Sequence, residues 1–148
     1  MKNTLMALCL ACAGLLALPA LAQSNTAAAP AGLYQALGEK PGIDRLVDDF
    51  VNRAVKDPRI GAHFRDTKPA ALKESLADQF CQLSGGPCKY EGADMKSAHA
   101  DMQINKGHFH ALVEVLQAAM DAQGIPFAQQ NRLLALLAPM HRDVITVH

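Results

Sequence analysis

Three of the six histidines lie on the inward side of expected helices, where a side chain could bind a metal. They are His99, His108 and His141, whereas His110 points outward. A lone inward histidine is more often a core residue bonded to a backbone carbonyl than a ligand. The spacing therefore proposes three candidates for a metal ligand and does not choose among them.

Several common chemistries lack their residues in this sequence. Zinc needs three or four Cys or His donors, usually with two on one helical face, but His108 and His110 diverge on a helix. The sequence has no glycine-rich phosphate loop and no Gly-x-Ser-x-Gly elbow. With 14 basic and 14 acidic residues and no basic patch, it also does not resemble a nucleic-acid-binding protein.

The first residues have the pattern of a cleaved secretory signal, Met1–Ala22, with an apolar run and the small-residue site Ala20–Ala22. The run is short for the ~20 residues that cross a bilayer. We therefore expect export, most simply to the periplasm, with no membrane anchor after cleavage. The next segment, Gln23–Gly32, is small and polar and is expected to be a flexible leader. Residues 33–148 then suit one domain.

Two of the four cysteines, Cys81 and Cys88, follow the expected cleavage site. An exported protein meets an oxidising compartment, where two thiols can form a disulfide. The turn Gly85–Pro87 between them allows the chain to fold back. Because the closing geometry is specific, the sequence leaves a disulfide and two free thiols equally open.

Apolar residues recur at intervals of three and four along the chain, and this spacing predicts helices. The first main helix opens at Pro41-Gly42 and is closed by Asp57-Pro58, and a short segment covers Arg59–Arg65. The next helix begins near Pro69, behind a capping residue, and is stopped by Ser84–Pro87.

The second half of the sequence predicts three more helices. A short one covers Asp94–Met102 and a longer one Asn105–Gln123, and Gly124 ends the longer helix. The last begins near Pro126 and places Leu133, Leu134, Leu137, Met140 and Val144 inside. No stretch alternates apolar and polar residues as a half-buried strand does, so the expected fold class is all-α.

Taken in order, several short motifs resemble those of group I truncated haemoglobins. They are VDDF at 47–50, DPRI at 57–60, GGP at 85–87, MKSAH at 95–99, HF at 108–109, GIP at 124–126 and LLAPMHRDV at 136–144. The match covers Leu33–Val144 without large gaps. The resemblance implies a two-over-two helical sandwich that binds haem b, with His99 as the iron ligand and His108 in a structural or surface role.

The same resemblance implies a set of residues around the haem. These are Phe50, Phe64, Phe80, Met95, Met102, Phe109 and Leu112. Enclosing haem and packing a core need the same apolar side chains, so core packing is the alternative for each. Candidates for binding the haem propionates are Arg65, Lys68 and Lys89, and Tyr90 is a candidate for stabilising the irregular segment before His99.

The expected distal side, where a gas would bind, departs from the family pattern. Its residues are Val51, Leu72, Ser75 and Leu76, and Val51 stands where the family often has a tyrosine. A hydrogen bond to bound oxygen is worth ~1–3 kcal/mol, so we expect oxygen to be held weakly relative to carbon monoxide or nitric oxide. Ser75, Gln79 or a swung-in His63 could restore a donor.

These expectations favour reversible binding of O2, NO or CO at a pentacoordinate iron held by His99. A haem enzyme is the first alternative. Nitric oxide dioxygenation would need an electron donor and retained oxygen, and peroxidase chemistry would need a distal acid or base that the sequence does not reveal. The second alternative is a haem-free helical interaction domain. The sequence leaves the oligomeric state open.

Overall fold

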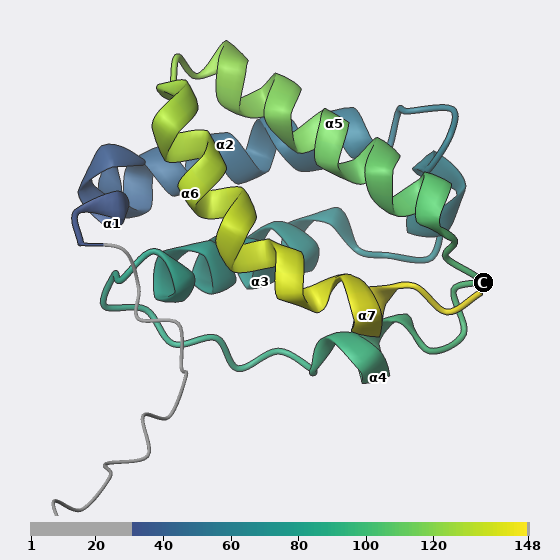
Figure 1. The fold of residues 1–148 in the computed structure, drawn as a ribbon. Coiled ribbons are helices and arrows are strands. Elements are labelled where there is room, and N and C mark those ends of the chain that lie inside the picture. Colours follow the sequence, from purple (N-terminus) through teal and green to yellow (C-terminus); the bar gives the residue numbers. More distant parts are fainter. Residues whose placement is uncertain (1–30, 148) are drawn as a thin grey trace, which may run out of the picture.

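The computed structural model describes residues 31–147, and within them every regular element is a helix (Figure 1). The elements are α1 (Leu33–Ala36), α2 (Glu39–Ala54), the 3₁₀ helix η1 (Gly61–Phe64), α3 (Pro69–Leu83), α4 (Met95–His99), α5 (Lys106–Ala122), α6 (Phe127–Leu137), the 3₁₀ helix η2 (Ala138–Met140) and α7 (His141–Val144). The predicted all-α class is confirmed. The predicted signal segment and nearly all of the predicted leader lie outside the described residues. Within the described part, no helix is both long and apolar enough to cross a membrane.

Four longer helices make two layers. In Figure 1, α5 and α6 lie in front, and α2 and α3 lie behind them. Helix α2 packs against both α3 and α5, and α6 crosses in front of α3. The short helix α4 lies at the edge of this sandwich, next to α7. This arrangement leaves α4 outside the main packed layers.

The core lies where α2 meets α3 and α5, and it is aliphatic with few aromatic rings. Leu46 of α2, Met120 of α5 and Leu133 of α6 are fully buried. The rings of Phe50 and Phe80 stack at 6.4 Å between centroids and join α2 to α3. Because each buried side chain of this size contributes ~1.5–3 kcal/mol, these contacts fix the positions of the four longer helices.

Helix boundaries differ from the sequence prediction where backbone chemistry decides them. Helix α2 begins at Glu39, ahead of the expected opening at Pro41, because Gly38 takes a left-handed conformation (φ 82°) and turns the chain into the helix. The prediction of a capping side chain before α3 is wrong, because Lys68 occupies the N-cap position and makes no capping hydrogen bond.

The last predicted helix is interrupted. Helix α6 ends at Leu137, and Pro139 lies in a 3₁₀ turn before α7 begins at His141. Proline has no N–H for the helical ladder and therefore favours such a break. Of the residues predicted to be inside, Leu133 and Val144 are buried, and the other three are partly buried.

Candidate functional site

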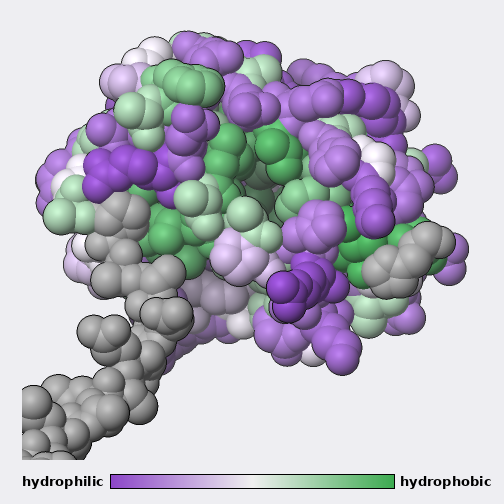
Figure 2. Space-filling view, in the orientation of Figure 1, coloured by the Kyte–Doolittle hydropathy of each residue, from purple (hydrophilic) through white to green (hydrophobic). Residues whose placement is uncertain are grey.

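An apolar cavity of about 500 Å³, called here the main cavity, lies between α3, α4, α5 and α6. Figure 2 shows a recess walled by hydrophobic side chains near the middle of the face that Figure 1 presents. Its wall includes all seven predicted haem contacts, Phe50, Phe64, Phe80, Met95, Met102, Phe109 and Leu112, together with His99. Among the described residues, none that lines this cavity is charged. The cavity therefore suits a flat apolar guest.

His99 is the last residue of α4 and lines this cavity, and one hydrogen bond orients its ring. Its Nδ1 lies 2.7 Å from the backbone carbonyl oxygen of Met95. Since a carbonyl oxygen only accepts hydrogen bonds, Nδ1 carries a proton, and in the neutral ring Nε2 then carries the lone pair. An imidazole oriented by a carbonyl in this way is the usual protein ligand of haem iron.

The short helix that carries His99 is held mainly by polar bonds. The Asp94 carboxylate accepts hydrogen bonds from the Ser97 backbone N–H at 2.9 Å and from its hydroxyl at 2.7 Å. These bonds, the backbone one first, lower the pKa of Asp94 from its ordinary value. The helix covers Met95–His99 and is shorter than the predicted Asp94–Met102. Met102 lies beyond its end. Asp94 thus acts as the N-cap of the helix that carries His99.

A second chamber of about 120 Å³, called here the side chamber, adjoins the main cavity. Leu72, Leu76 and His99 line both spaces. Val51, another of the predicted distal residues, lines the side chamber. Ser75 lines the main cavity. Three of these four distal residues are aliphatic, so this side of the site offers few groups that could donate to a bound gas.

Apart from His99, the histidines in the described part of the chain do not line the main cavity. His108 belongs to a capping box with Asn105 at the start of α5, and its Nδ1 lies 3.1 Å from Nε2 of His63. Its ring therefore has a structural partner, and both histidines line the side chamber. Burial, and then the charge of His108, lower the pKa of His63. His141 packs edge-on against the Phe109 ring, with 4.8 Å between centroids.

One buried amide faces the main cavity. Gln79 is 6% exposed, and its Nε2 lies 3.8 Å from the sulfur atoms of Met95 and Met140. Thioether sulfur is a weak acceptor, so this amide lacks a strong hydrogen-bonding partner in the cavity. The sequence could not assign Met140 to the site, because it lies beyond the break at the end of α6.

None of the three cations predicted for the propionates lines the main cavity. Lys89 is 80% exposed at its side chain and pairs with Glu91, and Arg65 and Lys68 are exposed. Neutral groups of Thr67 and Tyr90 line the cavity in their place. The Tyr90 hydroxyl donates to the Ala93 carbonyl at 2.7 Å and so stabilises the segment before α4.

Cys81 and Cys88 are joined by a disulfide, with 5.7 Å between their Cα atoms. Cys81 is fully buried near the end of α3. Gly86 passes so close to the Cys81 sulfur that a side chain there would collide with it. The bridge fixes the end of α3 to the segment that leads to Tyr90 and α4.

The C-terminal segment closes the other end of the site. The Thr146 hydroxyl accepts from the Ile104 backbone N–H at 2.9 Å, and the Thr146 N–H donates to the Ile104 carbonyl at 2.9 Å. Val144, just before this segment, lines the main cavity. These bonds hold the loop between α4 and α5 from outside.

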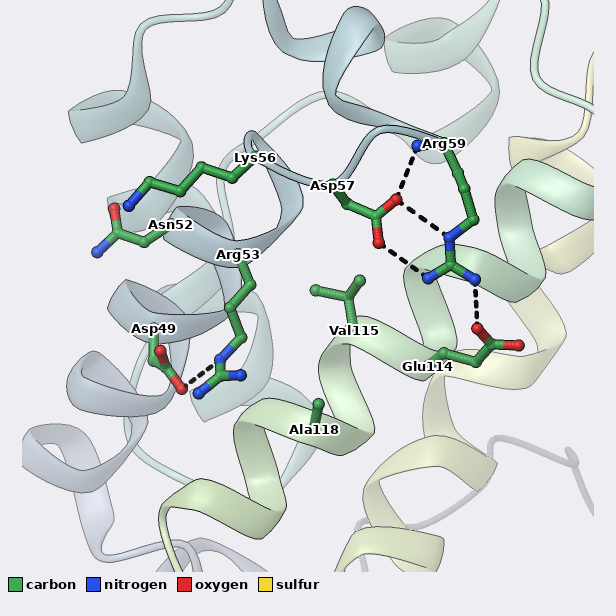
Figure 3. A pocket seen from close by; sticks show the side chains of 9 residues that line it. All are labelled: Asp49, Asn52, Arg53, Lys56, Asp57, Arg59, Glu114, Val115 and Ala118. Atoms are coloured by element: carbon green, nitrogen blue, oxygen red, sulfur yellow. Dashed lines mark hydrogen bonds and ion pairs between the residues drawn. The ribbon is translucent and has the colours of Figure 1, made fainter.

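A third hollow, the surface groove between α2 and α5, is polar (Figure 3). Five of its six charged side chains form ion pairs: Arg53 pairs with Asp49, and Arg59 bridges Asp57 and Glu114. In the part of the chain that the structure describes, no three His, Cys, Asp or Glu side chains meet to hold a bare metal ion. Haem needs only one protein ligand, so the main cavity with His99 fits it and this groove does not.

Comparisons with known proteins agree with this geometry. The family model described as "Bacterial-like globin" matches residues 32–146. The group 1 truncated haemoglobin of Synechocystis is 34% identical over 119 residues, which cover 76% of this chain and 96% of the relative.

Solved structures show the same fold. The truncated haemoglobin of Tetrahymena pyriformis in its Fe(III) form aligns with a TM-score of 0.73 and 26% identity, covering 76% of this chain and 97% of the other. The 2/2 haemoglobin of Synechococcus also aligns with a TM-score of 0.73, at 23% identity, covering 78% of this chain and 98% of the other. The chain therefore belongs to the bacterial-like globin family, has the truncated haemoglobin fold, and uses haem as its cofactor.

Proposed function

We propose that this globin binds a diatomic gas reversibly at a pentacoordinate haem iron whose protein ligand is Nε2 of His99. The observation that carries the proposal is the 2.7 Å bond from His99 Nδ1 to the Met95 carbonyl, in the wall of an apolar cavity. This bond fixes the ring and leaves the Nε2 lone pair free. Haem supplies the iron at which the gas binds.

The distal residues exclude water and offer a bound gas little polarity. Val51 is 1% exposed, and Leu72 and Leu76 continue the same aliphatic wall. A ligand that draws negative charge, such as oxygen, gains most from a nearby donor, whereas carbon monoxide gains little. The site therefore favours carbon monoxide and nitric oxide over oxygen, and nitric oxide dioxygenation and peroxidase chemistry are not favoured.

The haem ligand is tested by an absorption spectrum of the purified protein. We expect a Soret band, a five-coordinate ferrous form, and loss or strong weakening of haem binding in His99→Ala. His110→Ala is the matched control, because His110 is exposed on α5. A Soret band and ferrous spectrum that are unchanged in His99→Ala would contradict the assignment.

The apolar distal side is tested by stopped-flow measurement of oxygen release. Val51→Tyr introduces a hydroxyl beside the side chamber and should slow oxygen release about tenfold, the equivalent of ~1.4 kcal/mol. Val51→Phe is the control of matched size without the hydroxyl. Equal release rates in these two variants would mean that the missing donor does not set the retention of oxygen.

We further propose export to the periplasm after cleavage behind Ala22. The signal pattern of the first residues and a disulfide between Cys81 and Cys88 both support this proposal. Mass spectrometry of the protein isolated from its source should give a mature chain that begins at Gln23. An intact Met1 in protein from the cytoplasmic fraction would contradict it.

A further inference from the structure

Two histidines far apart in the sequence face each other at the side chamber. His63 comes from η1 and His108 from the first turn of α5, and their rings lie edge to face with centroids 4.5 Å apart. His63 Nε2 and His108 Nδ1 are separated by 3.1 Å, which is a hydrogen-bond distance. Both rings line the chamber that His99 also lines. They therefore lie beside the space proposed for the gas.

The capping box of α5 decides which histidine donates. The Asn105 backbone N–H, which can only donate, lies 3.4 Å from His108 Nδ1. This nitrogen is therefore an acceptor, and it also accepts a hydrogen bond from the N–H of His63. His63 then donates from Nε2, and this N–H is directed at His108 and not at the chamber. The Met102 backbone is a second polar partner of the His63 ring.

Apart from the three histidines, the described residues that line the side chamber are all apolar. His99 is already committed through its Nδ1 to the Met95 carbonyl. Two N–H groups then remain on these histidines, the one at His108 Nε2 and the one on His63, and the direction of the His63 N–H contributes to how polar the chamber is. Burial lowers the pKa of His63, and this favours the neutral ring with its single N–H.

We propose that His108 is a positioning residue that holds the N–H of His63 away from the gas and so removes one hydrogen-bond donor from the side chamber. The proposal rests on the proposed function, because it concerns the same gas site. A bond between two neutral groups contributes only ~0.5–1.5 kcal/mol net. Loss of the His108 acceptor would thus free His63 to donate to a polar ligand, or to coordinate the iron itself.

The experiment measures the C–O stretching frequency of the carbon monoxide complex, together with oxygen release, in His108→Leu. A donor near bound carbon monoxide lowers this frequency, and it slows the release of oxygen. We expect both changes in His108→Leu, with oxygen release slowed severalfold. His110→Leu is the matched control on the same helix, two residues away and exposed.

Two further variants separate positioning from a general structural effect. His63→Leu alone should leave the C–O frequency unchanged, and it should abolish the effect of His108→Leu in the double variant. His108→Gln, unlike His108→Leu, should keep the wild-type C–O frequency and oxygen release rate. A glutamine at this place in a capping box can accept hydrogen bonds from the Asn105 N–H and from His63. A change in helix capping alone would not move the C–O frequency through His63.

Each outcome decides the proposal. An unchanged C–O frequency in His108→Leu overturns it, and so does a shift that persists when His63 is also leucine. A rise in the frequency would mean that His108 itself donates to the gas, which also overturns it. Wild-type protein that contains haem but binds no carbon monoxide would overturn both this inference and the proposed function.

Discussion

The two sides of the haem cavity are built in different ways. On one side, α2, α3 and α5 bury their aliphatic faces against one another, and Phe80 is only 2% exposed. On the other side, none of the five residues of α4 is fully buried, and the helix is held by its Asp94 cap and by contact with α7. The wall that α2, α3 and α5 form is thus part of the core, whereas the wall at α4 depends on a few polar bonds and a disulfide.

This difference teaches that stability and haem retention are separable in this fold. Substitutions in the packed wall should lower the free energy of unfolding of the whole domain. Substitutions around α4 should instead speed haem loss while leaving most of the helical structure in place, because local openings need break only the few bonds there. The following predictions test that separation, beginning with the largest effect.

Phe80→Ala should have the largest effect on folding. It removes a buried ring that stacks on Phe50 between α2 and α3, and such substitutions cost about 3–5 kcal/mol. Urea unfolding of the haem-free protein measures the loss. Phe127→Ala, at the most exposed large apolar side chain in the described chain, should change stability little. A loss below about 1 kcal/mol at Phe80 would show that the wall that α2, α3 and α5 form is not the stable side.

Removal of the disulfide should come next. Cys81→Ala/Cys88→Ala opens a short loop and should cost about 2–3 kcal/mol, because closing such a loop restricts the unfolded chain. Haem transfer to an acceptor protein should also be faster, since the bridge leads to Tyr90 and α4. The wild type treated with a reductant should match the double variant. If haem transfer stays unchanged, the bridge supports only α3.

Thr146→Val should have a smaller effect, centred on the loop between α4 and α5. It removes the acceptor of the Ile104 N–H and should cost about 1–2 kcal/mol if that group is left without a partner. We expect faster haem loss with little change in the far-ultraviolet circular dichroism. Thr146→Ser keeps the hydroxyl and should behave as the wild type. Equal haem loss in both variants would mean that the methyl group matters and the hydroxyl does not.

Asp94→Asn should have the smallest effect near neutral pH, because asparagine also caps helices well. The difference should appear in acid. The folded-state pKa of Asp94 is lowered below its ordinary 3.8, so its contribution is complete above that value and is lost as the pH falls through the lower folded value. Haem release in the variant should therefore lose part of its steepness below about pH 4.

Asp101→Asn, an exposed carboxylate in the same part of the chain, is the control for Asp94→Asn. The measurement is the Soret absorbance followed through an acid titration. If Asp94→Asn and Asp101→Asn follow the wild-type curve equally, the cap does not contribute to acid release of haem.

The all-helical class and the main helices could be predicted from the sequence because apolar spacing along one helix is a local signal. The boundaries were less accurate where Gly38 takes a left-handed conformation and where Pro139 interrupts the last helix, because a short turn can be accommodated in several ways. The cap before α3 was wrong because a favourable residue type does not guarantee that its side chain turns back to the helix.

The site was predictable only in part. The residues that resemble the family's haem contacts do gather in the main cavity, but the cations chosen for the propionates do not line it, since a surface lysine can point in many directions. The pairing of His63 with His108 joins positions 45 residues apart, and no local pattern signals it. The role of His99 stays a prediction that the proposed spectra can test.

The contact of Thr146 with Ile104 also bears on the order in which the site can be assembled during synthesis. Residues 144–147 follow every other described part of the cavity wall along the chain, yet they close the loop beside α4. A nascent chain that ends before them presents His99 on a helix whose outer support has not yet been made. Secure capture of haem should therefore occur after these residues emerge, as a late step in maturation and not during elongation.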